Sequence, residues 1–195
     1  MNAIYDLIGR KAYDIKMKHV VPAVPVIDRN QYLLKMAKGK TILDIGATGP
    51  MHEALRNIAK KCHGIDITTS NREDHYAINI DKATELPEIP EVELVIAGEL
   101  IEHLDNAGHF LDLLKRYLCP IILTTPNAFS SAGFRYMGHG IECVNPEHVA
   151  YYSWWTLSTL VRKHGYKLIE WYWYNGMPLT AEGIIFLMEA QNGTS

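Results

Sequence analysis

The chain has 195 residues, of which 48% are hydrophobic, and this length and composition predict one domain around a single core. The 19 basic and 22 acidic side chains give a formal charge of −3, which argues against nucleic acid or an anionic membrane as a partner. The three cysteines, Cys62, Cys119 and Cys143, form no C-x-x-C pair and predict reduced thiols in a cytoplasmic protein. No apolar run has membrane-spanning length, so we expect no membrane partner.

Two helices are predicted before the first strand. Apolar residues recur at helical spacing from Ile4 to Ile15, which predicts an amphipathic helix over residues 2–19. A second helix is expected over residues 28–38, with Asp28 as its N-cap. We expect residues 1–39 to form a helical cap on the sheet edge, with the alternative that the first helix closes over a ligand site as a lid.

The stretch KTILDIGATGP, residues 40–50, predicts a buried strand, a tight turn and the start of a helix. Gly46 and Gly49 let the backbone approach a ligand, and the helix N-terminus adds unpaired donors and a partial positive charge. Pro50 suits a first helical position, and the helix should run to about Lys61. Asp44, at the end of the strand, suits a ligand with an ammonium group or a hydroxyl.

A second strand is predicted over residues 63–67, and it contains Asp66, 22 residues beyond Asp44. In a βαβ unit an acidic side chain at this place accepts hydrogen bonds from the ribose hydroxyls of an adenosine group. The alternative for a single aspartate at a strand end is a turn or cap residue. The glycine turn upstream favours the ribose role.

The rest of the chain continues to alternate between strands and helices. Further strands are expected at 76–80, 92–97, 121–125, 167–174 and 183–189, the last two as an antiparallel hairpin. Helices are expected over 104–118, with Leu111, Leu114 and Leu118 facing inward, and from Ser153 to about His164. Residues 126–152 have no sustained period and predict a functional loop over the ligand-binding edge of the sheet. The aromatic residues from Tyr151 to Trp155 and from Trp171 to Tyr174 suggest core and helix packing or a dimer surface, with a stacking platform for a planar acceptor as the alternative.

Together these elements predict an α/β fold: a Rossmann-like three-layer sandwich whose seven-stranded, mostly parallel sheet has an antiparallel last strand and helices on both faces. Over residues 40–190 the sequence resembles the class I S-adenosylmethionine-dependent methyltransferases, particularly the small-molecule branch that includes the ubiquinone-biosynthesis O-methyltransferases. The resemblance is carried by ILDIGATG at 42–49, GIDI at 64–67, IDKATELP at 80–87, LVIAGELIEHL at 94–104, LTTPN at 123–127 and EHVAYYSWWTLSTLVRKHGY at 147–166.

The resemblance implies a site for S-adenosylmethionine, with S-adenosylhomocysteine as its product. Asp44, Gly46, Ala47 and Gly49 would hold the methionine part, and Gly98 would lie along its tail. Asp66 would bind the ribose, Ile67 would lie beside the adenine, and Asp81 would meet the adenine amino group next to Ile80 and the Lys82 backbone. Thr48 and Pro50 replace glycines that are common in this family, and Pro50 removes one backbone donor.

Methyl transfer from a sulfonium needs an aligned acceptor, exclusion of water and, for some nucleophiles, removal of a proton. His103, His148 and His139 are the candidate bases, because histidine loses its proton near neutral pH. The alternative for His103 and His148 is structural bracing, and for His139 it is substrate contact. No metal site is predicted, since no second histidine follows His52-Glu53 at helical spacing.

We therefore expect a methyltransferase acting on a small-molecule acceptor, with oxygen as the preferred nucleophile, in a monomer or homodimer. The main alternative is a catalytically silent protein of the same fold that acts as an adaptor, which the altered glycine turn leaves open. A nicotinamide-dependent oxidoreductase is disfavoured because the G-x-G-x-x-G spacing is missing.

Overall fold

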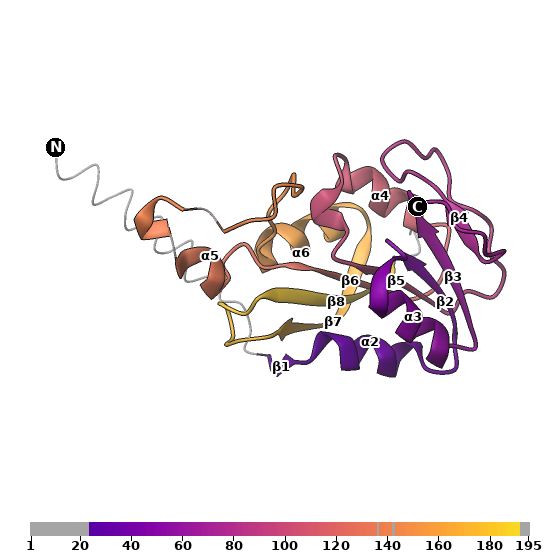
Figure 1. Cartoon of the computed structure of the whole chain (residues 1–195), viewed down its shortest axis with the longest axis horizontal. Coiled ribbons are helices and arrows are strands. Elements are labelled where there is room, and N and C mark those ends of the chain that lie inside the picture. Colours follow the sequence, from indigo (N-terminus) through magenta and orange to yellow (C-terminus); the bar gives the residue numbers. More distant parts are fainter. Residues whose placement is uncertain (1–23, 136, 142, 192–195) are drawn as a thin grey trace.

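The structure, a computed structural model, describes residues 24–135, 137–141 and 143–191 (Figure 1). The strands are β1 (Val26–Ile27), β2 (Thr41–Ile45), β3 (Lys61–Asp66), β4 (His75–Ala77), β5 (Leu94–Gly98), β6 (Ile121–Pro126), β7 (Tyr166–Tyr174) and β8 (Gly183–Ala190). The helices are α2 (Arg29–Ala37), α3 (Gly49–Ile58), α4 (Ala107–Leu114), α5 (Ser131–Arg135) and α6 (Trp154–Lys163), with short 3-10 helices η1 (Ile101–His103) and η2 (Met137–His139). The helix predicted over residues 2–19 lies outside the described residues.

The strands form one sheet in the order β1-β7-β8-β6-β5-β2-β3-β4. β8 runs antiparallel to its neighbours β6 and β7, and every other pair is parallel, which confirms the predicted hairpin and the antiparallel last strand. The sheet has eight strands in the described part of the chain, against seven predicted. The additional strand is β1, whose two residues beside β7 are too few to give an alternating pattern in the sequence.

Helices cover both faces of the sheet, as predicted. Figure 1 shows α2 and α3 along one face and α4 and α6 along the other. Successive residues of the central strands point to opposite faces, so each strand contributes to two hydrophobic clusters. On β2, for example, Leu43 and Ile45 pack in the cluster with α4 and α6, whereas Ile42 packs in the cluster with α2 and α3. Burial on both faces accounts for the nearly continuous apolar runs of β5 and β6.

The predicted helix over 104–118 is shorter in the structure, and the inward position of Leu118 is wrong. α4 ends at Leu114, and Leu118 is 86% exposed. Because the chain leaves the helix after Lys115, the helical period no longer sets the direction of Leu118. Tyr117 is buried instead, and its hydroxyl donates to the Pro87 carbonyl oxygen at 2.7 Å. Leu111 and Leu114 are fully buried, as expected.

Residues 126–152 form a long excursion whose ends are joined. The Ala128 N–H donates to the Tyr152 carbonyl oxygen at 2.8 Å, and Asn127 forms an isolated bridge with Tyr152. Between these ends, α5 and η2 lie in a lobe that projects beyond the sheet (Figure 1). No helix in the described part of the chain is long and apolar enough to span a lipid bilayer.

Candidate functional site

The glycine turn lies between β2 and α3, at the carboxyl edge of the parallel strands. Gly46 and Gly49 have φ values of 81° and 71°, a backbone region that favours glycine. The amides of Gly46 and Ala47 already donate to the Ile65 carbonyl oxygen, at 2.8 and 3.1 Å. A ligand can therefore come close to the backbone of these two residues, but it finds no free N–H donor on them. A side chain placed on Gly49 would meet no atom within 4 Å, so the turn is open at that point.

Asp44, predicted to hold the methionine part of a cofactor, lies under the turn with only 6% of its surface exposed. Its Oδ2 is 2.7 Å from Nδ1 of His52, a buried residue of α3. Burial raises the pKa of Asp44, and the hydrogen bond to His52 opposes that effect. His52 was missed as a site residue, because only the fold places α3 against the face of β2 on which Asp44 lies.

Asp66 lies at the end of β3, beside the turn, since β2 and β3 are paired in register at Ile45 and Ile65. Its Oδ1 accepts hydrogen bonds from the Thr68 amide at 2.8 Å and the Thr68 hydroxyl at 2.7 Å. Within the described residues, Oδ2 has no hydrogen-bond partner. Ile67, the next residue, is 67% exposed. A free carboxylate oxygen beside an exposed aliphatic side chain fits a ribose and its adenine.

The other predicted cofactor residues lie along the same edge. Ile80 is buried, and Oδ1 of Asp81 accepts a hydrogen bond from the Asn106 amide at 3.4 Å. Gly98 ends β5, and a side chain there would make only ordinary contact with the Thr124 hydroxyl. The residues predicted to contact the nucleoside of the cofactor therefore lie near β3 and β4. Those predicted to contact its methionine part lie near β2 and β5.

A second group of polar side chains follows β5. Glu99 has a φ of 53°, which is unusual for a residue with a side chain and is often found at functional sites. Its Oε1 accepts from the hydroxyls of Thr124 and Tyr174, both at 2.8 Å, and lies 3.3 Å from Nη1 of Arg29. These residues border a cavity of about 550 Å³ whose lining is Asp28, Arg29, Asn30, Glu99, Pro126, Tyr174, Asn175 and Glu182.

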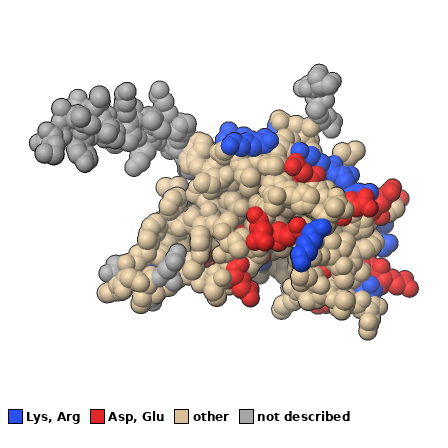
Figure 2. Space-filling model, turned by 90° about the horizontal axis from the view of Figure 1, so that it is seen from above, with Lys and Arg blue, Asp and Glu red and all other residues tan. Residues whose placement is uncertain are grey.

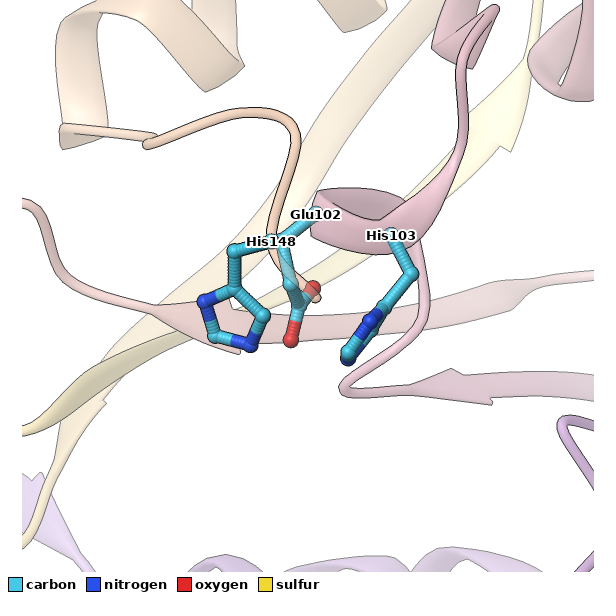
Figure 3. Close-up of side chains that lie close together, drawn as sticks. All are labelled: Glu102, His103 and His148. Carbon is cyan, nitrogen blue, oxygen red and sulfur yellow. The ribbon is translucent and has the colours of Figure 1, made fainter. Parts of the chain in front are cut away.

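Glu102 and His103, on η1, come together with His148 from the long excursion (Figure 3). The rings of His103 and His148 meet edge to face, with centroids 4.6 Å apart. Glu102 is only 1% exposed, and burial, followed by the charge of Glu99, raises its pKa to about 7. Burial, followed by the charge of His103, lowers the pKa of His148.

The sequence pointed to only part of this cluster. His103 and His148 were predicted as candidate bases, and the Glu102-His103 pair was considered as a cap or brace of the helix, but Glu102 was not predicted as a site residue. Its signal was the E-x-x-E-H pattern of residues 99–103, which begins directly after a buried strand. His139 is not part of the cluster: it is exposed in η2, within the projecting lobe.

The aromatic residues mainly serve packing. The Trp154 ring contacts the ring of Trp171 on β7, with centroids 5.2 Å apart, and Tyr152 is buried in the core. This arrangement ties α6 to the sheet and corresponds to the core and helix packing that the sequence suggested.

The mixed sheet, the glycine turn after its central strand and the acidic residue after the next strand define a class I S-adenosylmethionine-dependent methyltransferase. The model of the methyltransferase domain family matches residues 19–170, and the chain belongs to that family, with S-adenosylmethionine as its cofactor. No curated protein matches the sequence.

Three solved structures illustrate the similarity of fold. The small RNA methyltransferase HEN1 is 16% identical with a TM-score of 0.64; the match covers 91% of this chain but only 27% of the HEN1 chain. A chain from the complex of the Haloferax volcanii Trm112 methyltransferase activator with a methyltransferase is 12% identical, with a TM-score of 0.63 and 85% and 89% coverage. Burkholderia thailandensis 1,6-didemethyltoxoflavin-N1-methyltransferase, solved with its substrate and S-adenosylhomocysteine, is 11% identical, with a TM-score of 0.61 and 84% and 78% coverage.

Proposed function

We propose that this protein transfers the methyl group of S-adenosylmethionine to a hydroxyl oxygen of a small, polar acceptor. The observation that carries the proposal is the meeting of two groups at one sheet edge. The free carboxylate oxygen of Asp66 and the exposed Ile67 suit a nucleoside, and the polar residues after β5 suit an acceptor. Open α/β sheets bind their ligands at this edge.

In this proposal the cofactor lies along the edge from β4 to β5. Asp66 receives the ribose hydroxyls, Ile67 lies beside the adenine, and Asp81 meets the adenine amino group next to the Ile80 backbone. Asp44, Gly46, Ala47, Gly49 and Gly98 surround the methionine part. The bound cofactor supplies an activated methyl group, whose carbon–sulfur electron pair stays with the sulfur.

The residues after β5 orient the acceptor. Glu99 and Arg29 border the cavity of about 550 Å³, whose polar lining favours a small hydrophilic molecule. Glu102, His103 and His148 supply the polar atoms to which the reacting hydroxyl is brought. As the oxygen forms its bond to the methyl carbon, His103 or His148 takes its proton. His139 stays outside this proposal, because it is exposed in the projecting lobe.

The test combines cofactor binding with turnover. We expect calorimetric titration of the full chain to give one site for S-adenosylmethionine and one for S-adenosylhomocysteine. We also expect release of S-adenosylhomocysteine with at least one member of a panel of small hydroxylated metabolites, and none with a single-stranded RNA oligonucleotide. Release with the RNA alone would overturn the small-molecule assignment. Figure 2 supports that assignment, because blue and red side chains are interspersed over the face shown, without a continuous basic surface.

One observation favours a second candidate, a protein of this fold that binds a partner without catalysis. Pro50 carries no N–H, and the Gly46 and Ala47 amides are engaged by Ile65, so the turn offers a cofactor fewer donors. Absence of binding to both forms of the cofactor in the same titration would favour this candidate.

We also infer a reducing, cytoplasmic location and a monomer or homodimer. All three cysteines are free thiols, including the exposed Cys143. Light scattering of the purified chain with thiol counting under denaturing conditions tests both points. Oligomers larger than a dimer, or fewer than three titratable thiols, would contradict them.

A further inference from the structure

Three side chains of metal-ligand type converge beside the proposed acceptor site. One carboxylate oxygen of Glu102 and one ring nitrogen each of His103 and His148 all lie within 4.8 Å of one another. Figure 3 shows the carboxylate of Glu102 between the two imidazole rings. Two imidazoles and one carboxylate are a common ligand set for divalent transition metals.

The fold holds these residues together although His148 is far from the other two in sequence. The Glu102 carbonyl oxygen accepts main-chain hydrogen bonds from Val149 at 2.9 Å and Ala150 at 3.2 Å. These bonds fix the backbone directly after His148 to η1. From the neighbouring strand β6, the Thr125 hydroxyl donates to Oε2 of Glu102 at 2.9 Å and orients its carboxylate. In metal sites of proteins, a ligand residue is typically oriented by a hydrogen bond from a second residue that does not itself bind the metal.

Part of the polar capacity of these side chains is unused. Oε1 of Glu102 is buried and has no hydrogen-bond partner among the described residues, and the whole residue is only 1% exposed. Within the described residues, no hydrogen bond reaches a ring nitrogen of His103 or His148. Buried polar atoms are normally paired, so the buried and unpaired Oε1 of Glu102 beside two partly exposed imidazoles points to a site for a cation.

The spacing suits a single cation. Three atoms that lie within 4.8 Å of one another always have a point no more than about 2.8 Å from all of them, and bonds from Zn²⁺ to nitrogen or oxygen are ~2.0–2.2 Å. The side chains therefore need to close by less than about 1 Å to reach bonding distance. The imidazole rings contact each other edge to face, and in the described part of the chain no hydrogen bond holds either ring nitrogen in place.

We propose that Glu102, His103 and His148 bind one divalent first-row transition-metal cation, such as Mn²⁺ or Co²⁺. Imidazole ligands favour transition metals such as Co²⁺ over Mg²⁺ and Ca²⁺, which prefer sites made of oxygen, and the carboxylate of Glu102 also suits Mn²⁺. Three protein ligands leave coordination positions open for an exogenous oxygen. As an extension that rests on the proposed function, the acceptor hydroxyl occupies one of them, and the cation orients it and makes it more acidic. The two histidines then act as ligands rather than as bases, and the proton of the hydroxyl leaves to solvent water.

The experiment uses the full chain, stripped of metal with a chelator and desalted. Mn²⁺ is titrated and its free form is measured by electron paramagnetic resonance, and Co²⁺ is followed by its visible absorption. The test variants are Glu102→Gln, His103→Asn and His148→Asn. Glu102→Gln keeps the size of the side chain and an acceptor for Thr125. The matched control is His164→Asn, because His164 lies at the end of α6, paired with Asp112.

We expect one saturable Mn²⁺ site in the wild type and in the control, and at least tenfold weaker binding in each ligand variant. The proposal is overturned if the wild type has no saturable site, or if either histidine variant keeps the wild-type affinity. If circular dichroism finds Glu102→Gln unfolded, the two histidine variants decide the result.

Titration of S-adenosylhomocysteine on the same samples separates this inference from the proposed function. Binding of S-adenosylhomocysteine without binding of Mn²⁺ removes the metal site and leaves the methyltransferase proposal intact. Binding of Mn²⁺ without S-adenosylhomocysteine supports the metal site and contradicts the proposed cofactor site.

Discussion

Two aspartates end neighbouring parallel strands, yet their surroundings give them different tasks. Asp44 is almost completely buried and bonded to His52, so its carboxylate links β2 to α3. Asp66 is half-buried, with one oxygen held by Thr68 and the other free. A carboxylate that is already oriented by one oxygen binds a ligand through the other with little further ordering. Asp66 is therefore the residue at which cofactor affinity is best tested.

We expect Asp66→Ala to weaken S-adenosylhomocysteine binding by about 1.5–3 kcal/mol, through loss of the hydrogen bonds from the ribose to a charged acceptor. Isothermal titration calorimetry measures the change. Glu189→Ala is the matched control, because Glu189 is an exposed carboxylate near the end of β8. Equal affinity in the Asp66 and Glu189 variants would contradict the ribose assignment.

At the level of elements, α6 and the β7–β8 hairpin stabilise the half of the sheet that borders the acceptor cavity. α6 begins with a capping box, in which the Ser153 hydroxyl accepts from the Thr156 amide and the Thr156 hydroxyl accepts from the Ser153 amide. The hairpin pairs Tyr174 with Gly183, and the Tyr174 hydroxyl reaches Glu99. The capping box fixes the start of α6, and the bond from Tyr174 to Glu99 joins the hairpin to the edge of the sheet where the candidate site lies.

We expect Ser153→Ala to lower the free energy of unfolding by about 1 kcal/mol, because it leaves helix amides without their cap. Urea denaturation followed by circular dichroism measures the effect. Thr159→Ala, at an exposed position inside α6, is the comparison and should be neutral or slightly stabilising. A larger loss for Thr159 than for Ser153 would show that the cap does not determine the stability of α6.

We expect Gly183→Ala to destabilise the fold by about 1–3 kcal/mol, because the added carbon would overlap the Tyr174 ring and hydroxyl. The same denaturation assay applies. Repeating the substitution in a Tyr174→Ala background removes the overlap, so the two changes should be strongly non-additive. Simple additivity would mean that the close contact is relieved in some other way.

At the scale of the whole molecule, the site is a property of the sheet edge rather than of one segment. β2, β3, β5 and β6 are parallel neighbours, so the segments that follow them meet at one edge. The excursion from β6 returns over this edge through the bonds from Val149 and Ala150 to Glu102. Binding at this edge contacts segments from several parts of the chain and should stabilise the folded state globally.

We expect S-adenosylhomocysteine to raise the melting temperature of the full chain. At a hundredfold excess over its dissociation constant, a ligand that binds only the folded state contributes about 2.7 kcal/mol. Differential scanning fluorimetry across a concentration series measures the shift, and Asp66→Ala should reduce it at each concentration. A melting temperature that does not depend on concentration would contradict binding at this edge.

The sequence by itself determined the order of the elements, the antiparallel hairpin and the places of Asp66 and the glycine turn. Buried strands, glycine turns and amphipathic helices leave local patterns, because each depends on neighbouring residues. These patterns could not predict the two-residue strand β1 or the exposed position of Leu118. β1 owes its existence to pairing with β7, and Leu118 follows the end of α4.

Only the tertiary structure decided which polar residues act together. His52 meets Asp44 because α3 packs on one face of β2, and His148 meets Glu102 and His103 because the long excursion is bonded back onto η1. Such contacts depend on sheet order and on main-chain hydrogen bonds between distant segments, which leave no periodic signal in the sequence. For that reason the sequence indicated a methyltransferase but no metal site, and the fold brought together the three side chains for which we propose one.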